Sequence, residues 1–228
     1  MTMYRFARTP RLLAAVSIIS LAGCFSLGRA TPPLEQYVLG ASGATTAAPA
    51  APDSGTLTIG LRRLDLAAYL STRLIVVRRG AHQIVTSDFR RWGEDPGEGI
   101  NRVVGAHLST AQPVRTVDVA PWPTRSQHDF LVAVHVSRFE GVADSAVAEG
   151  SVHVLAAWEI IRPQDNAVVA RGRTDHREGQ WTVGDYAGLV ILLDTALGRV
   201  ARDIRTCLGR LAVAAGRPAD QWPAGPSC

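Results

Sequence analysis

Residues 130–161 read FLVAVHVSRFEGVADSAVAEGSVHVLAAWEII, and this stretch decides the fold class. Within it, apolar side chains alternate with polar or small ones over two runs, residues 130–139 and 151–161. Alternation with a period of two is typical of a strand that buries one face. Because small residues separate the two runs, we expect a long antiparallel hairpin, with Trp158 on its buried face.

The longest predicted element follows these strands and is a helix over residues 185–213. Its apolar residues recur at intervals of three and four, which places them in one stripe along the helix. We expect this amphipathic helix to pack on the sheet. The stripe consists of Tyr186, Leu189, Val190, Leu193, Leu197, Val200, Ile204 and Leu208.

Shorter elements surround the hairpin and complete the fold class. Asp95 and Pro96 have the residue types of an N-cap and a first helical position, so a second helix is expected from there to Leu108. Gly80 is expected in a tight turn between two strands. The order of elements predicts an α+β fold, with helices packed on a mixed, mainly antiparallel sheet. The remaining strands are predicted at 56–61, 74–78, 83–86, 114–119 and 168–174, and a short helical turn at 64–70.

The N-terminal sequence MTMYRFARTPRLLAAVSIISLAGC has the pattern of a secretory signal. A basic region with three arginines precedes the mainly apolar run 12–21, which is too short to cross a bilayer. Residues 21–24, Leu-Ala-Gly-Cys, are similar to the bacterial lipobox, in which the cysteine is acylated and the chain is cleaved before it. We therefore expect residues 1–23 to be a signal peptide and Cys24 to anchor the chain in a lipid membrane.

Charge and residue usage exclude several function classes. The chain has 228 residues with 24 basic and 20 acidic side chains, and every basic one is arginine. The absence of lysine excludes a Walker A loop, a lysine Schiff base and a pyridoxal phosphate site. Removal of the leader leaves the chain nearly neutral, so we expect no nucleic-acid partner. Phe25 stands where an aspartate would retain a lipoprotein in the inner membrane, which indicates the outer membrane, facing the periplasm.

Past the leader, composition predicts three segments. Residues 24–55 form a lipidated tether, a short strand and a flexible loop rich in Gly, Ala and Pro, and residues 56–216 form a single α+β domain. Residues 217–228 form a loose tail. Cys207 and Cys228 either form a disulfide, which the periplasm permits, or remain a buried thiol and a terminal one.

Catalytic and metal-binding patterns are absent from the sequence. It contains no GxSxG, CxxC, HExxH or GxGxxG motif, so we expect no catalytic residue, no cofactor and no metal. In a hairpin centred near residue 145, His135 faces residue 155 and lies diagonally from His153 on the same face. Two histidines fall short of a zinc site, which needs at least three protein ligands. The polar stretch 175–178 is expected to be a solvated loop.

The aromatic segment Arg90-Arg91-Trp92 joins a predicted strand to a predicted helix. A tryptophan beside two arginines is typical of a contact surface for a partner. It is equally compatible with a core tryptophan whose arginine neighbours pair with nearby carboxylates. The sequence leaves both interpretations open.

Several motifs follow one another in a recognisable order along residues 24–208. They are the lipobox, Tyr37-Val38-Leu39, Arg91-Trp92-Gly93-Glu94-Asp95-Pro96 leading into a helix, Val136-Ser137-Arg138-Phe139-Glu140, Leu155-Ala156-Ala157-Trp158 and the final helix. In this order the chain resembles the PqiC-like ABC-type transport auxiliary lipoproteins, which accompany mammalian-cell-entry type lipid transporters. None of these motifs is catalytic. The loop at 40–55 and His135 depart from the family's pattern.

The resemblance implies a non-enzymatic outer-membrane lipoprotein that docks a mammalian-cell-entry type periplasmic protein of an ABC transporter. It also implies a homo-oligomer, because family members form rings. The alternative is a periplasmic lipoprotein that regulates cell-wall synthesis or envelope assembly, since a small α+β domain serves either role. An envelope hydrolase is disfavoured by the missing catalytic residues.

Overall fold

The computed structural model describes residues 32–40, 55–143, 148–214 and residue 228. The expected signal peptide, Cys24 and most of the loop at 40–55 lie outside the described residues, as does most of the expected tail. The chain divides into two compact units, Met1–Pro33 and Leu34–Cys228, and only the second is described below. Its elements are β1 (Glu35–Tyr37), β2 (Leu57–Leu61), β3 (Asp65–Leu66), a 3₁₀ helix (Ala68–Leu70), β4 (Leu74–Arg79), β5 (Gln83–Trp92), α2 (Pro96–Leu108), β6 (Val114–Val119), β7 (Phe130–Ala143), β8 (Glu149–Arg162), β9 (Ala167–Thr182) and α3 (Tyr186–Ala214).

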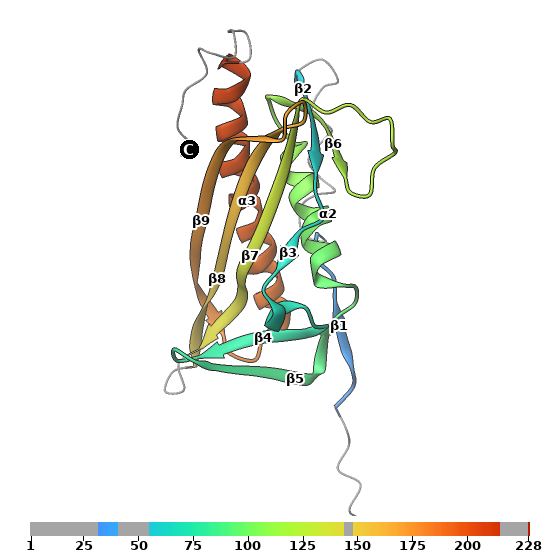
Figure 1. Ribbon diagram of the computed structural model, residues 1–228. Coiled ribbons are helices and arrows are strands. Elements are labelled where there is room, and N and C mark those ends of the chain that lie inside the picture. The colour runs from blue at the N-terminus through green and yellow to red at the C-terminus, as the bar shows by residue number, and fades with distance from the viewer. Residues whose placement is uncertain (1–31, 41–54, 144–147, 215–227) are drawn as a thin grey trace, which may run out of the picture. The chain divides into compact units, whose positions relative to one another are not determined.

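The long strand β7 organises the sheet (Figure 1). On one side it pairs with antiparallel β8, which in turn pairs with antiparallel β9. On its other side three short parallel strands follow one another, with β2 beside residues 130–132, β3 beside 135–136 and β4 beside 141–143. The sheet is therefore mixed, as predicted. Its long ladders are antiparallel, whereas the short pairings along β7 are parallel.

The outer strands extend this arrangement. β4 and β5 form the predicted antiparallel hairpin, with Gly80 at a φ of 58°, a conformation that suits glycine. β1 adds to β5 and β6 adds to β2, both in parallel. Because β1 belongs to the second compact unit, the part of the chain that leads in from the expected tether is built into the sheet.

The helix α3 lies along one face of β7, β8 and β9, behind the sheet in the view of Figure 1. Its apolar stripe is buried as predicted, and Trp158 of β8 belongs to the same core. Burial of each large apolar side chain stabilises the fold by about 1.5–3 kcal/mol. The helix α2 packs beside α3. Fully buried residues of the stripe are Leu189, Leu193, Leu197, Ile204 and Leu208.

A glycine in β9 makes room for the core tryptophan. A Cβ at Gly172 would overlap the indole ring of Trp158, so this ring lies directly over the backbone of the neighbouring strand. Any larger residue at position 172 would displace the ring. The close approach explains how α3 and the sheet enclose a side chain of this size.

The start of α2 has the predicted cap. The Asp95 side chain accepts a hydrogen bond from the backbone N–H of Glu98, at 3.1 Å, and Pro96 is the first helical residue. The carboxylate also lies at the positive end of the helix dipole. This cap fixes where β5 ends and α2 begins.

Three local predictions were wrong. Residues 175–178 are not a loop but part of β9, where they pair with residues 152–155 of β8. Polar residues are compatible with a strand here because β9 is an edge strand with one face away from α3. The helical turn expected at 64–70 is the strand β3 followed by a 3₁₀ helix, and the strand expected at 37–39 ends at Tyr37.

Candidate functional site

The segment that the sequence singles out, at the end of β5, holds the N-terminal strand of the domain. Residues 35–37 of β1 pair in parallel with residues 90–92 of β5. Residues 35–40 together with residues 90–95 are called the clamp below. Since residue 35 follows Cys24 by only eleven positions, the clamp is where the expected tether joins the folded domain.

A chain of polar contacts ties β1 to β5 and α3. The guanidinium of Arg90 donates to both carboxylate oxygens of Glu35, at 3.3 and 3.4 Å, and lies 5.6 Å from the centre of the Tyr186 ring. The Tyr37 hydroxyl donates to Glu35 at 2.6 Å. This bond, followed by the charge of Arg90, lowers the pKa of Glu35. Burial and the Glu35 carboxylate raise the pKa of Tyr37 to about 12, so Tyr37 stays a hydrogen-bond donor.

A second set of contacts fastens the residues after β1. Arg102 of α2 donates to the backbone oxygen of Leu39, at 3.2 Å, and also pairs with Glu94. Leu39 itself is 2% exposed and belongs to the core. The backbone N–H of Gly40 donates to the carboxylate of Asp194 in α3, at 2.9 Å. The clamp therefore connects the strand β1 to both helices and to the sheet.

The three candidate contact residues have different surroundings. Trp92 is 4% exposed and packs against Phe139 of β7, with ring centres 5.9 Å apart. Arg90 is half-buried and engaged with Glu35. Arg91 is exposed, and its Nε donates to the backbone oxygen of Asp88 at 3.1 Å. Of the three, Arg91 presents the most surface to a partner.

The face of the sheet away from α3 carries a buried charged cluster that the sequence analysis missed. Glu140 of β7 is fully buried and forms ion pairs with Arg78 of β4 and Arg138 of β7. The Tyr69 hydroxyl donates to Glu140 at 2.9 Å. Burial and then the Glu140 charge raise the pKa of Tyr69, and the hydrogen bond to Glu140 raises the pKa of Arg78. These groups satisfy one another, so the cluster joins β4, β7 and the 3₁₀ helix.

The two histidines of the hairpin do not come together, and the predicted register was wrong. His135 pairs with Ala157 rather than with residue 155, and His153 pairs with Glu140. The hairpin is centred between residues 146 and 147 rather than on residue 145, and the irregularity of β7 between Val136 and Arg138 changes the register by one residue. The histidines are therefore offset by four residues along β8, about 13 Å at the rise of a strand.

Each histidine has its own carboxylate partner. Nδ1 of His135 lies 2.7 Å from Asp65, and Nε2 of His153 lies 2.8 Å from Asp175. Within the described part of the chain, no group of three or more His, Cys, Asp or Glu side chains gathers in a way that could hold a metal ion.

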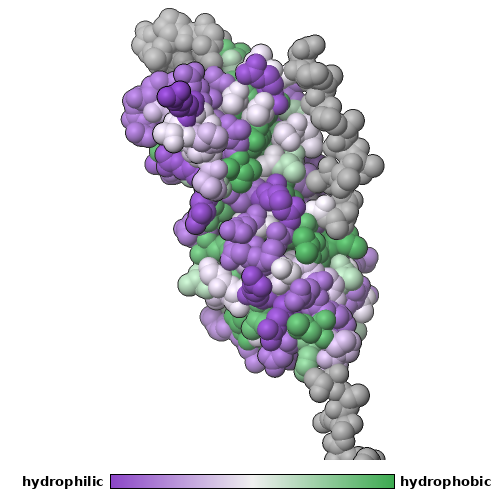
Figure 2. All heavy atoms as spheres, turned by 90° about the vertical axis from the view of Figure 1, so that its right-hand side faces the viewer, coloured by the Kyte–Doolittle hydropathy of each residue, from purple (hydrophilic) through white to green (hydrophobic). Residues whose placement is uncertain are grey.

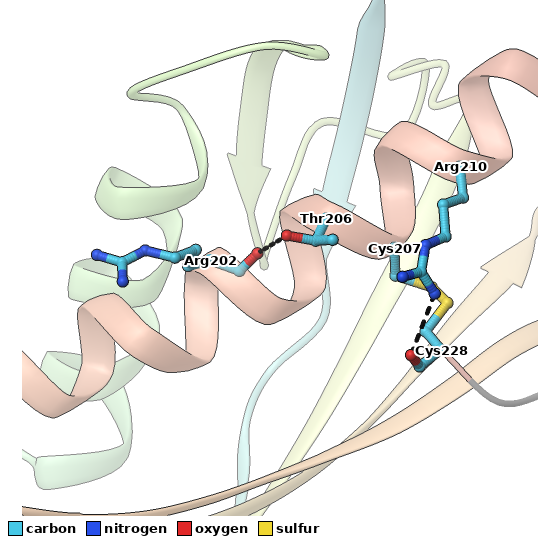
Figure 3. The surroundings of a disulfide bond; sticks show 5 residues. All are labelled: Arg202, Thr206, Cys207, Arg210 and Cys228. Carbon is cyan, nitrogen blue, oxygen red and sulfur yellow. Dashed lines mark hydrogen bonds between the residues drawn. A yellow bond between two sulfur atoms is a disulfide. The ribbon is translucent and has the colours of Figure 1, made fainter.

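The structure joins Cys207 and Cys228 in a disulfide, with their Cα atoms 5.6 Å apart (Figure 3). Cys207 is fully buried in α3. The backbone N–H of Cys228 donates to the backbone oxygen of Arg171 in β9, at 3.1 Å, and Arg210 donates to the backbone oxygen of Cys228, at 3.2 Å. The C-terminal residue is thus attached to both α3 and the edge of the sheet.

A comparison with protein families identifies the fold and the class of protein. Residues 37–205 match the family described as the ABC-type transport auxiliary lipoprotein component. The chain belongs to this family. The match includes the clamp from Tyr37 onwards and all but the end of α3. It bears out the resemblance noted for the sequence.

Solved structures show the same fold for this auxiliary lipoprotein. Protein XCC0632 from Xanthomonas campestris, which carries the family name DUF330, is 14% identical with a TM-score of 0.60, over 73% of this chain and 94% of that one. A second structure, described as an uncharacterized protein, is 15% identical with a TM-score of 0.58, over 78% and 99%. Identities this low show the fold alone. A comparison with curated proteins finds no match.

The family name describes a lipoprotein. Neither α2 nor α3 is both long and apolar enough to span a bilayer. Cys24, the residue expected to carry the lipid, lies outside the described residues.

Proposed function

We propose that the protein is a non-enzymatic outer-membrane lipoprotein that docks a mammalian-cell-entry type periplasmic protein of an ABC lipid transport system. Membership of the auxiliary lipoprotein family supports the association with an ABC transporter. The lipobox at residues 21–24 and the absence of an aspartate after Cys24 support the outer-membrane anchor. The sequence contains no GxSxG, CxxC, HExxH or GxGxxG motif, which disfavours an envelope hydrolase.

The clamp is the structural observation that carries this proposal. A subunit that holds a partner near a membrane must transmit force between its lipid and its folded domain. Here β1 is hydrogen-bonded into the sheet directly after the expected tether, and Leu39 and Gly40, which follow β1, are bound to the two helices. Glu35 follows Cys24 by eleven positions, and an extended chain of that length reaches roughly 40 Å at most. The domain would therefore remain close to the membrane surface.

The docking surface is expected to include Arg91. This exposed side chain lies on the strand that binds β1, next to the point where the tether enters. The side of the domain that carries β6 and α2 shows hydrophobic residues only in separate small patches among hydrophilic ones (Figure 2). A partner that approaches this side would form mainly polar contacts, which favour specificity and fast association.

Affinity purification from the native membrane tests the proposal. The full-length chain, tagged at its C-terminus and expressed at its natural level, is cross-linked in cells and purified from the outer-membrane fraction. We expect mass spectrometry to find a mammalian-cell-entry type protein as a specific partner. A matched control is the variant Cys24→Ala, which should be lost from the outer-membrane fraction.

The same experiment distinguishes the alternative function. If the tagged chain instead retained a cell-wall synthase or its regulators, and no mammalian-cell-entry type protein, the docking role would be wrong and the alternative would replace it. Recovery of the chain in the inner-membrane fraction would contradict the proposed location.

A further inference from the structure

A cavity of about 350 Å³ lies in the groove between α2 and α3, on the helical layer of the domain. Its walls come from the end of α2, with His107 and Thr110, and from one side of α3, with Arg199, Arg202 and Arg205. The size falls within the range of small-ligand pockets. The cavity borders the clamp at Asp194, which binds Gly40, and shares no lining residue with the charged cluster around Glu140.

The spacing of the α3 residues explains why their side chains share the groove. Each of the positions 195, 198, 199, 202 and 205 lies three or four residues from another of them, so they share one side of the helix. Gly198 keeps the floor of the groove open, because a Cβ there would come within 3.5 Å of the His107 ring. Both walls are regular helices, which hold their side chains in more defined positions than loops would.

The groove contains positive charge that carboxylates do not balance. Arg205 donates to the backbone oxygen of His107 at 2.8 Å and to the Thr110 hydroxyl at 3.0 Å, so it is fixed against the end of α2. Burial, followed by the charge of Arg202, lowers the pKa of Arg205. Arg199 and Arg202 are exposed and have no ion pair to any carboxylate among the described residues.

The wall of this cavity contains one carboxylate, Asp194, against three guanidinium groups, so it offsets only part of their charge. Asp194 is 6% exposed and accepts the hydrogen bond from the backbone N–H of Gly40 in the clamp. Guanidinium groups that lie near one another and outnumber the carboxylates repel, and a bound anion relieves that repulsion. The planar fork of a guanidinium matches the geometry of phosphate oxygens, and a threonine hydroxyl adds a further donor.

We propose that the groove between α2 and α3 binds a phosphate group, with Arg199 and Arg202 pairing with its oxygens and Arg205 and Thr110 forming the inner end of the site. The phosphate belongs either to a free phosphate ion or to the headgroup of a phospholipid. Binding at this site does not require the docking role proposed above, so either proposal can fail without the other.

Isothermal titration calorimetry tests the site, with the full-length chain in detergent micelles and in chloride buffer. Inorganic phosphate is the first probe. We expect saturable binding of one phosphate per chain, weakened about tenfold or more in the double variant Arg199→Gln/Arg202→Gln. Arg205 is left unchanged because it holds the end of α2.

A matched double variant controls for the loss of two positive charges. The double variant Arg173→Gln/Arg210→Gln removes two positive charges that lie outside the groove. Figure 3 shows the Arg210 side chain turned towards Cys228, whereas the Arg202 side chain extends away from Cys228. This control should bind phosphate like the wild-type chain. Circular dichroism and a melting curve verify that both double variants are folded.

Two further probes identify the source of the phosphate. If glycerol 3-phosphate and dihexanoylphosphatidylglycerol bind at least as well as inorganic phosphate, the site takes a lipid headgroup. If only inorganic phosphate binds, it takes the free ion. The proposal is overturned if none of the three probes binds saturably, or if the two double variants weaken binding equally.

Discussion

Trp92 lies in the core although arginines precede it in the sequence. Its ring packs against Phe139 of β7, which is 47 positions further along the chain, and 4% of the residue is exposed. No local pattern could distinguish this burial from an exposed contact, because the partner ring comes from another strand. The neighbouring Arg91, by contrast, is exposed. At this segment Trp92 belongs to the core, and Arg91 is the residue whose side chain is left exposed.

Replacement of Trp92 should therefore destabilise the domain. Trp92→Ala removes a buried indole and leaves a cavity beside Phe139, which we expect to lower the free energy of unfolding by about 3–5 kcal/mol. Urea unfolding followed by circular dichroism measures the change. Arg91→Ala is the matched control and should unfold like the wild-type chain. Equal unfolding midpoints for Trp92→Ala and the wild type would show that the indole contributes nothing to the core.

Buried ionisable groups on the open sheet face were the least predictable part of the structure. Glu140 appears in the sequence as a single glutamate within an apolar strand, and its partner Arg78 precedes it by 62 positions. The irregularity of β7 before Arg138 also changes which side chains share a face. Sequence alternation alone therefore could not place these groups together.

His153 gives the fold a dependence on pH. Burial lowers its pKa below 6.5, and the charges of Arg177 and Arg138 act in the same direction, against the hydrogen bond to Asp175. Glu140 is its register partner on β7. The unfolded chain therefore binds more protons than the folded chain once the pH falls below 6.5, and stability decreases as the pH falls further towards the folded pKa.

The variant His153→Gln separates this contribution from that of other groups. Glutamine keeps an N–H for Asp175 but cannot be protonated. We expect the urea midpoint of the wild type to decrease between about pH 7.5 and pH 5.5, and that of His153→Gln to decrease less. The pKa of Asp175 is also lowered, through its bond to His153, but its effect on stability appears only below about pH 5. Identical pH profiles for the two chains would refute the assignment to His153.

At the level of elements, local periodicity was sufficient to predict the longest helix and the existence of the hairpin of β7 and β8, but not its register. It was sufficient for α2 as well, because the cap at Asp95 and Pro96 is a local feature. The parallel pairings of β2, β3 and β4 along β7 could not be predicted. These strands are short, and their pairing depends on one long strand that comes much later in the chain.

The disulfide attaches the C-terminal residue to α3, and its loss should weaken the domain. Cys207 and Cys228 are 21 positions apart, and closing a loop of that length stabilises by about 3 kcal/mol in the chain-entropy model. Cys228→Ser removes the bond and leaves the buried Cys207 in place. We expect a lower urea midpoint for this variant, and a reductant should shift the wild type to the same value. Two thiols that react freely in the denatured, unreduced wild type would contradict the disulfide.

The whole molecule combines an expected lipid anchor, the clamp and a domain in which the sequence analysis finds no catalytic motif. The clamp makes mechanical sense if the chain before it is held in a membrane. It connects β1 to the sheet and both helices, so a force on the tether acts on the core of the domain. Sequence alone predicted the anchor and the fold class, but not how the two are connected, because Asp194 and Arg102 bind the clamp from distant helices.

The expected lipid anchor requires acylation of Cys24. Cys24→Ala should leave a precursor that retains the leader and carries no acyl label, because the lipobox needs a thiol at that position. Metabolic labelling with a fatty acid measures this, with the wild type as the labelled control. Label that persisted on the alanine variant would place the lipid elsewhere.

The proposed function requires this lipoprotein to bind a mammalian-cell-entry type protein. Biolayer interferometry between the purified full-length chain in detergent micelles and the mammalian-cell-entry type proteins of the same bacterium measures it most directly. We predict saturable binding to one of them, weakened about tenfold by Arg91→Glu and unchanged by Arg210→Glu. If the folded chain binds none of these proteins, the docking role is contradicted.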